Sequence, residues 1–300
     1  MKKHIIGIDL GGTNLKIGLL GPNCDLLEKK SLTTCQFVAK EELISAICAS
    51  VSSWGLPKKA ILGIGLGLPG PIDTKRGIVH FFPNIPGWKN VGLRDILRKR
   101  LGCAVYIDND ANLMALAESR LGAARGCSNA VCLTLGTGVG GGIIIDGELY
   151  RGSTFSAGEA GHMPINEDGP MCGCGSYACL ESYVGNKKIL AAARRAFKRD
   201  ISLEELSRLA ARGDRRARAI WCDVGAKIGV ALSGIINLLN PDCVVIGGGV
   251  ANAGPILFNS IRETVLCRAM LVQAKHVKIK KALLSDSGII GAGLLVKEGR

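Results

Sequence analysis

The sequence predicts an α/β protein made of two similar lobes. Short apolar runs rich in Val, Ile and Leu are punctuated by glycine, which is typical of this class. The pattern of strand, glycine turn and strand occurs twice, at His4–Leu20 and at Ala130–Asp146. Because a repeated pattern indicates a repeated architecture, and because 300 residues can hold more than one core, two related lobes are expected.

The first half of the chain is predicted to alternate strands and helices. It opens with a hairpin in which His4–Asp9 pairs with Leu15–Leu20 around the turn Leu10–Asn14. Apolar residues at helical spacing follow, and then buried-type apolar runs. The expected elements are a helix at Glu41–Ser53, strands at Ala60–Leu66 and Ala104–Ile107, and a helix at Asp110–Leu121.

The second half is predicted to begin with a hairpin and then to become mainly helical. The hairpin has a strand at Ala130–Leu135, a turn at 136–142 and a segment Ile143–Asp146. Ser202 and Glu205 form a capping box for one of the later helices. Further elements are helices at Asn186–Lys198, Ser202–Arg212 and Asp214–Leu239, a strand at Cys243–Gly247, and an apolar helix at Gly288–Glu298 that is placed to cross back to the first lobe.

Composition argues against several classes of protein. No run approaches the roughly 20 apolar residues of a membrane span, and the N-terminus lacks the apolar region of a signal peptide, so we expect a cytoplasmic protein without a membrane partner. Most of the 12 cysteines should therefore be reduced. The net charge of +13 is densest in Lys187–Arg199 and Arg208–Arg218, which we interpret as solvated helix surfaces rather than a nucleic-acid site.

Glycine turns supply candidate phosphate-binding loops. The turn containing Gly11, Gly12 and Thr13 exposes backbone N–H groups without Cβ obstruction, and Asp9 beside it suits Mg²⁺. A matching turn contains Gly136, Thr137 and Gly138, and neither turn has the P-loop pattern. A third turn, with Gly248 and Gly249, has room for adenine and ribose, although a plain strand-to-helix turn fits it equally well.

Polar side chains cluster where a strand is predicted to meet a helix, at 108–112. The carboxyl ends of strands in α/β folds collect ligands, although polar residues there are also common helix caps. Asp110 is placed to accept a proton from a substrate hydroxyl, and Asp108 is interpreted as structural.

A cluster of one histidine and three cysteines has the ligand types of a zinc site. His162, Cys172, Cys174 and Cys179 would form a closed Cys₃His set, which favours a structural ion. Glu159 and Glu181 flank the same stretch and can accept hydrogen bonds from sugar hydroxyls.

These motifs together resemble the ROK family of sugar kinases and repressors, within the actin-like superfamily. The resemblance spans nearly the whole chain. It departs from the family pattern at Ala178, where glycine is usual before the last cysteine. It rests on Asp9–Thr13, Leu68–Asp73, Asn109–Asn112, Gly136–Gly138 and the block Glu159–Glu181.

The resemblance implies two actin-like, ribonuclease H-like lobes around a central cleft, with a small zinc-binding knot. It places residues 1–110 and a C-terminal helix at 286–300 in the small lobe, and residues 111–285 in the large lobe. It implies an ATP-dependent hexose kinase whose expected substrate is glucose. Such a kinase would use ATP, Mg²⁺ and structural Zn²⁺, and it would assemble as a homo-oligomer, either a dimer or a tetramer. The implied roles are Asp110 as general base; Asn109, Glu159, His162, Glu181, Gly70 and Asn84 at the sugar; Asp9, Gly11, Gly12, Thr13, Lys16, Gly136, Thr137, Gly138, Gly248 and Gly249 at the Mg-nucleotide; and His162, Cys172, Cys174 and Cys179 on zinc.

Two alternatives remain from the sequence. A kinase for N-acetylmannosamine or N-acetylglucosamine would use the same sugar-contacting residues. A sugar-responsive repressor would need a DNA-binding domain, and the phosphate loop at Asp9 leaves no room ahead of it in this sequence. We therefore expect sugar and nucleotide, and not nucleic acid, as partners.

Overall fold

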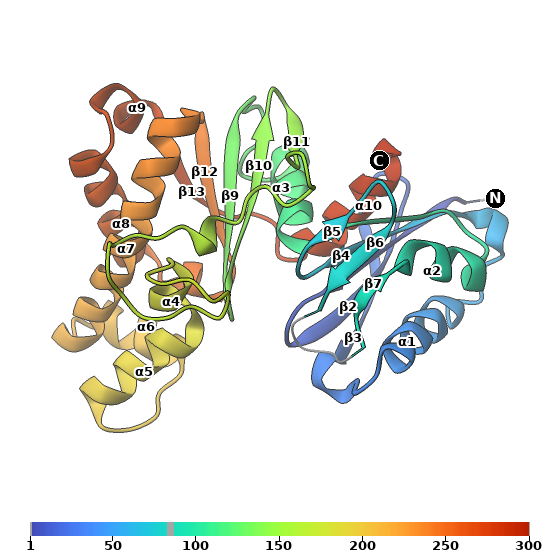
Figure 1. The fold of residues 1–300 in the computed structure, drawn as a ribbon, viewed down its shortest axis with the longest axis horizontal. Helices are drawn as coiled ribbons and strands as arrows, with labels where there is room; N and C mark the ends of the chain where they lie inside the picture. Colours follow the sequence, from blue (N-terminus) through green and yellow to red (C-terminus); the bar gives the residue numbers. More distant parts are fainter. Residues whose placement is uncertain (1, 83–86, 300) are drawn as a thin grey trace. The chain divides into compact units, whose positions relative to one another are not determined.

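The computed structural model describes residues 2–82 and 87–299 (Figure 1). The chain divides into two compact units. Unit 1 contains Met1–Arg120, Leu149–Ala157 and Leu284–Arg300, and unit 2 contains Leu121–Glu148 and Gly158–Leu283. The first segment of unit 1 thus ends at Arg120 rather than at residue 110. The short segment Leu149–Ala157 belongs to unit 1, although the residues on either side of it in sequence belong to unit 2.

Unit 1 is built on a five-stranded sheet of order β3-β2-β1-β4-β8. The first three strands are antiparallel neighbours, whereas β4 and β8 run parallel to β1. This arrangement contains the predicted hairpin and adds an edge strand, β3, that the sequence patterns did not identify. The bounds are β1 His4–Leu10, β2 Asn14–Leu20, β3 Leu26–Thr33, β4 Ile61–Leu68 and β8 Val105–Asn109.

Helices cover both faces of this sheet. Helices α1 (Lys40–Ser52) and α2 (Leu93–Leu101) bury their apolar side chains against one face, together with Ile6 and Ile8 of β1. Helices α3 (Asp110–Leu121) and α10 (Ser287–Glu298) pack on the other face. The C-terminal helix therefore completes the unit that the N-terminal strand begins.

Two glycines allow α10 to lie close against the sheet. A Cβ atom at Gly7 of β1 would collide with the carbonyl oxygen of Ile289, and one at Gly65 of β4 would collide with the carbonyl oxygen of Ala292. Since neither backbone can yield without moving the helix, these positions require glycine.

A second, three-stranded sheet belongs to the same unit and was not predicted. Its order is β5-β6-β7, with bounds Ile72–Asp73, Ile78–Phe81 and Lys89–Val91. The strands are two to four residues long, which is too short for a recognisable apolar alternation.

Unit 2 repeats the arrangement of unit 1 with a sheet of order β11-β10-β9-β12-β13. Strand β10 is antiparallel to β9, and β12 and β13 run parallel to β9. The prediction of a turn over 136–142 was wrong in part, because β10 begins at Val139 and its glycines pair with β9. The bounds are β9 Ala130–Leu135, β10 Val139–Ile145, β11 Glu148–Tyr150, β12 Cys243–Gly247 and β13 Lys278–Lys281.

The helices of unit 2 pack into one core with Val131 and Leu133 of β9. The capping box is formed in part, because the Ser202 hydroxyl accepts the Glu205 N–H at 3.1 Å. The bounds are α4 Glu181–Val184, α5 Asn186–Phe197, α6 Leu203–Ala211, α7 Arg215–Leu239, α8 Pro255–Arg268 and α9 Leu271–His276, of which α4, α8 and α9 were not predicted.

Helix α7 is long and apolar enough to cross a membrane by length and composition, which the sequence analysis did not anticipate. Its apolar side chains are used inside unit 2. Trp221, Ile228, Leu232 and Ile236 are fully buried, and the helix packs along α8. These contacts are those of a central core helix.

Candidate active site and metal centre

The turn between β8 and α3 positions the predicted general base. The Asn109 side-chain oxygen accepts the N–H groups of Ala111 at 2.9 Å and Asn112 at 3.3 Å, which caps α3. Asp110 is therefore the first residue of the helix, where the helix dipole favours a negative charge. The cap interpretation of this motif is confirmed for Asn109, and the role of Asp110 as base stays a prediction.

Gly70, a predicted sugar-site residue, lies next to this turn. Its carbonyl oxygen accepts the Asn109 side-chain N–H at 3.3 Å. Gly70 has a φ of +85°, and a Cβ atom there would lie 2.7 Å from the carbonyl oxygen of Phe81. The structure thus brings Gly70, Asn109 and Asp110 together, whereas Asn84 lies outside the described residues.

Asp108 lies beneath the same turn and is only 1% exposed. Its carboxylate accepts hydrogen bonds from the Asn109 N–H at 2.7 Å and the Asn112 side chain at 2.9 Å. Arg151 completes its coordination with an ion pair at 2.7 Å. The sequence reasoning assigned Asp108 a structural role but missed Arg151, because no local pattern links two residues so far apart in the chain.

The first glycine turn joins β1 to β2. The Gly11 N–H donates to the Asn14 carbonyl at 2.9 Å, and the Thr34 hydroxyl donates to the Gly11 carbonyl at 2.9 Å. A Cβ atom at Gly11 would meet only ordinary contact, 3.5 Å from the Asn14 carbonyl oxygen. Packing within the protein therefore does not require glycine here, and the binding of a phosphate at this turn stays a prediction.

Asp9 lies at the end of β1, opposite Lys16 in the β1–β2 register. A Cβ atom at Gly288, in the first turn of α10, would collide with the Asp9 carboxylate, so the carboxylate lies against that helix end. Burial raises the pKa of Asp9, Lys16 lowers it, and Asp286 raises it further. A buried carboxylate with a raised pKa gains from a nearby cation, which suits a divalent metal ion.

The second glycine turn joins β9 to β10 and holds the carboxylate of Glu181. One Glu181 oxygen accepts the Val139 N–H at 2.9 Å. A Cβ atom at Gly138 would collide with the same carboxylate, whereas a Cβ atom at Gly136 would meet nothing within 4 Å. Glu181 and Gly138 are thus in direct contact, and Gly136 is open.

The third glycine turn follows β12. Gly248 has a φ of +85°, and a Cβ atom there would collide with the carbonyl oxygen of Leu135. This close contact sets the third turn beside the second one, whose first residue follows Leu135. A Cβ atom at Gly249 would meet nothing within 4 Å, so in this turn packing accounts for Gly248 but not for Gly249.

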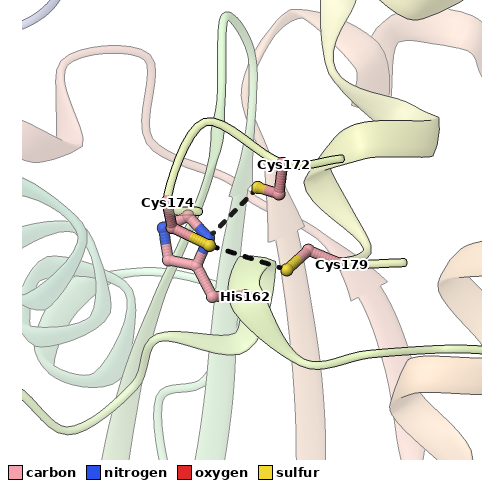
Figure 2. Close-up of side chains that lie close together, drawn as sticks. All are labelled: His162, Cys172, Cys174 and Cys179. Atoms are coloured by element: carbon pink, nitrogen blue, oxygen red, sulfur yellow. Dashed lines mark hydrogen bonds between the residues drawn. The ribbon is translucent and has the colours of Figure 1, made fainter. Parts of the chain in front are cut away.

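His162 and three cysteines converge in unit 2 (Figure 2). The donor atoms of His162, Cys172, Cys174 and Cys179 all lie within 4.8 Å of one another. His162 Nδ1 lies 3.7 Å from the Cys172 sulfur, and the sulfurs of Cys174 and Cys179 are 3.7 Å apart. The spacing of the ligands in sequence therefore corresponds to a compact cluster in space.

The chemistry of this cluster fits a zinc ion. Burial and the neighbouring thiols Cys174 and Cys172 raise the pKa of Cys179 to about 12. The neighbouring thiols therefore oppose the ionisation of Cys179, whereas a hydrogen bond from the Ser176 backbone and contacts with the other thiols lower the pKa of Cys174. A dication that binds thiolates would remove the penalty at Cys179. Three sulfurs and one imidazole nitrogen are a set typical of closed, structural zinc sites.

The other ring nitrogen of His162 points away from the cysteines. Nε2 lies 3.9 Å from a carboxylate oxygen of Glu159. A metal on Nδ1 would fix the ring and leave Nε2 as a hydrogen-bond donor on the Glu159 side. His162 and Glu159 thus lie close together, and their binding of a sugar stays a prediction.

Ala178, the one departure from the glycine of the family pattern, lies in the loop that carries the last cysteine. Its φ is +55°, in the left-handed region that glycine adopts without strain. The Ala178 N–H donates to the Pro170 carbonyl at 3.0 Å, and its carbonyl accepts the Ile165 N–H at 2.9 Å. The turn is therefore formed despite the alanine.

The chain is similar to known proteins over nearly its whole length. The model of the ROK family matches residues 5–299. The chain is 37% identical to the glucokinase of Thermotoga maritima, over 99% of this chain and 98% of that protein. It is also 33% identical to a xylose repressor of Caldicellulosiruptor bescii, over 95% of this chain and 76% of that protein.

A solved structure extends this similarity to the fold. The ROK family glucokinase of Streptomyces griseus, in complex with glucose and AMPPNP, matches with a TM-score of 0.86 and 32% identity, over 99% of this chain and 100% of that chain. The sheets of the two units agree with this fold. Because the family model matches residues 5–299, which is almost the whole chain, the chain belongs to the ROK family.

Proposed function

We propose that this protein is an ATP-dependent hexose kinase that phosphorylates glucose to glucose 6-phosphate. The observation that carries the proposal is the match, over nearly the full chain, to a glucokinase and to a glucokinase structure with glucose and AMPPNP. Asp110, at the start of α3 and beside the cap Asn109, supplies the base that such a reaction needs.

In this proposal, a residue of unit 1 activates the sugar hydroxyl that accepts the phosphoryl group. Asp110 takes the proton from the sugar hydroxyl as that oxygen attacks the γ-phosphorus of ATP. Asn109 and Gly70 hold the sugar beside it, and the proposed sugar set also includes Asn84. Because phosphoryl transfer depends mainly on positioning, the rigid cap of α3 is as important as the carboxylate itself.

The sugar also contacts residues from the zinc-binding part of unit 2. Glu159 and Glu181 accept hydrogen bonds from its hydroxyls, and His162 donates one from Nε2. The contact between Glu181 and Val139 supports this role, because it fixes the carboxylate on a phosphate-binding turn. His162, Cys172, Cys174 and Cys179 hold the zinc ion, which keeps the imidazole oriented and takes no part in bond making.

The nucleotide is bound by the glycine turns. Backbone N–H groups of the two hairpin turns bind the phosphates. Asp9 binds Mg²⁺, and Lys16 pairs with the negative charge of the phosphates. Gly248 and Gly249 lie at the nucleoside end. The proposed set is Asp9, Gly11, Gly12, Thr13, Lys16, Gly136, Thr137, Gly138, Gly248 and Gly249.

A coupled assay of ADP release tests the function and its alternatives. Glucose, mannose, fructose, N-acetylglucosamine and N-acetylmannosamine are compared at equal concentration with Mg-ATP. Glucose should give the highest kcat/KM. A clear preference for either N-acetylated sugar would mean that the protein is the corresponding N-acetylhexosamine kinase instead. If none of the five sugars supported ADP release, the proposal would be refuted.

We also propose a cytoplasmic homo-oligomer that does not bind nucleic acid. Exposed apolar side chains in unit 2 support the oligomer, among them Met270, Leu271 and Val272 near α9 and Leu238 at the end of α7. The repressor alternative makes the opposite prediction for DNA, namely sugar-dependent binding that weakens steeply with salt.

A further inference from the structure

The short segment Leu149–Ala157 is fastened to unit 1 by a buried ion pair. The Arg151 guanidinium donates to one oxygen of Asp108, from Nε at 2.8 Å and from Nη2 at 2.7 Å. The Asp108 side chain is 1% exposed and the Arg151 side chain 18%. Charge-assisted hydrogen bonds that are this well shielded are held strongly in one geometry.

The other oxygen of Asp108 organises the turn that carries the proposed base. It accepts the Asn109 N–H at 2.7 Å and the Asn112 side-chain N–H at 2.9 Å. These two donors lie on either side of Asp110 in the chain. A single carboxylate therefore links Arg151 to both flanks of the base.

Arg151 also closes the loop that leads toward Glu159. Its carbonyl oxygen accepts the Ala157 N–H at 3.0 Å, so residues 151–157 return on themselves. Gly158 then follows at a φ of +93°, packed against the backbone of Gly141. The same residue thus anchors the segment that precedes one proposed sugar ligand and supports the turn that carries the proposed base.

We propose that Arg151 is a positioning residue for phosphoryl transfer that acts through Asp108 on Asn109 and Asp110. Arg151 touches neither substrate nor reacting atoms in this role. Its removal would leave a buried carboxylate without its cation, and any response that relieves this cost would weaken the hydrogen bonds by which Asp108 holds the turn. The inference rests on the proposed function, because it assigns Arg151 to the acceptor side of that reaction.

The test compares Arg151→Met with Arg151→Lys and with a matched ion pair in the same unit. Arg120 pairs with Glu298 at 2.7 Å and is also partly shielded, with side chains 27% and 19% exposed, so Arg120→Met is the control. Arg151→Met should lower kcat by about 10²-fold, the size of effect expected from a small misplacement of reacting groups. Arg151→Lys should recover part of that loss, since lysine restores the charge but not the two-donor geometry.

Further readouts separate positioning from loss of fold. Zinc content and the KM for ATP should stay within about 3-fold of wild type in Arg151→Met, because both depend on other residues. Arg120→Met should keep kcat within about 3-fold of wild type, even if it lowers Tm as much as Arg151→Met does. Asp108→Asn should lower kcat, and adding Arg151→Met to it should cause little further loss, because the two side chains act as one unit.

Wild-type kcat in Arg151→Met would overturn the inference, and so would equal losses of kcat in Arg151→Met and Arg120→Met. Amide hydrogen exchange at 109–112 keeps the test independent of the assigned reaction. Exchange there should be faster in Arg151→Met than in wild type and unchanged in Arg120→Met. If the wild-type enzyme phosphorylated no hexose while this difference held, the proposed function would fail but the support of the turn by Arg151 would stand.

Discussion

Glu181 accepts a hydrogen bond from the backbone N–H of Val139 at 2.9 Å, which ties a proposed sugar ligand to a proposed phosphate-binding turn. The contact depends on Gly138, because a Cβ atom there would collide with the carboxylate. A change at Gly138 is therefore expected to reach the proposed sugar site through Glu181, whereas Gly136 has no such contact.

Replacing each of the two glycines of this turn should therefore give different results. Gly138→Ala should displace Glu181 and raise the KM for glucose by at least about 10-fold, the effect of losing a positioned charge-assisted hydrogen bond. Gly136→Ala has open space in the protein and should raise mainly the KM for ATP. Steady-state kinetics with each substrate varied measure this, with Gly92→Ala, also in open space, as the control. Identical kinetics for the two turn variants would contradict the separation.

Asp110→Asn should lower kcat by roughly 10²-fold or more while glucose affinity changes only a few-fold. The amide keeps the shape of the side chain but cannot take the hydroxyl proton. Turnover measures the first effect and isothermal titration with glucose the second. Near-normal turnover would remove Asp110 from the role of base.

Metal analysis should find about one zinc ion per chain, in keeping with a single Cys₃His cluster. Cys174→Ser should lose the metal and the sugar affinity together, because His162 is then no longer held by its Nδ1. Cys222→Ser, which changes an exposed cysteine outside the cluster, is the control. Full activity in protein freed of zinc would exclude the ion from any role in the sugar site.

Asp9→Asn should stabilise the protein while abolishing its use of Mg-ATP. Burial raises the pKa of Asp9, so the folded state holds this proton more tightly than the unfolded state. The stability that Asp9 contributes is therefore present below its unfolded pKa and is lost as pH rises through the folded pKa. At pH 7 without nucleotide or metal, Asp9→Asn should raise Tm by a few degrees, about the shift produced by 1 kcal/mol in a chain of this size.

The same comparison at pH 4 provides the sign test. A larger share of the wild-type carboxyl is protonated there than at pH 7, because burial raises the pKa of Asp9, and the difference in Tm should shrink. Asp168→Asn removes an exposed carboxylate and should shift Tm little at either pH. A Tm for Asp9→Asn below that of wild type at pH 7 would show that the ionised carboxylate stabilises the fold.

The exposed apolar side chains around α9 should take part in self-association. Val272 is 80% exposed and Leu271 is 59% exposed. Val272→Lys should shift the molar mass measured by light scattering toward that of one chain, with little change in Tm. Lys275→Ala, on the same helix, is a control that retains the apolar groups. An unchanged mass for Val272→Lys would place the interface elsewhere.

The sequence by itself determined the repeated strands, the glycine turns and the ligand set of the proposed zinc site. Local patterns were sufficient for these features. Hairpins and helices are specified by apolar spacing and caps, and His162 lies within 20 residues of its cysteine partners. The short strands β5–β7 and the helices α8 and α9 carried too little periodicity to be identified. The turn predicted at 136–142 was too long, because Gly140, Gly141 and Gly142 belong to β10 and pair with β9.

Only the tertiary structure decided which distant residues meet. The pairing of Asp108 with Arg151, the contact of Glu181 with Val139, and the packing of α10 on Gly7 and Gly65 all join segments far apart in the chain. No local spacing encodes such contacts, because they depend on how strands order into a sheet and on which backbone surfaces are free of Cβ atoms. The physical reason is that burial and charge pairing act through space, whereas sequence patterns report only neighbours along the chain.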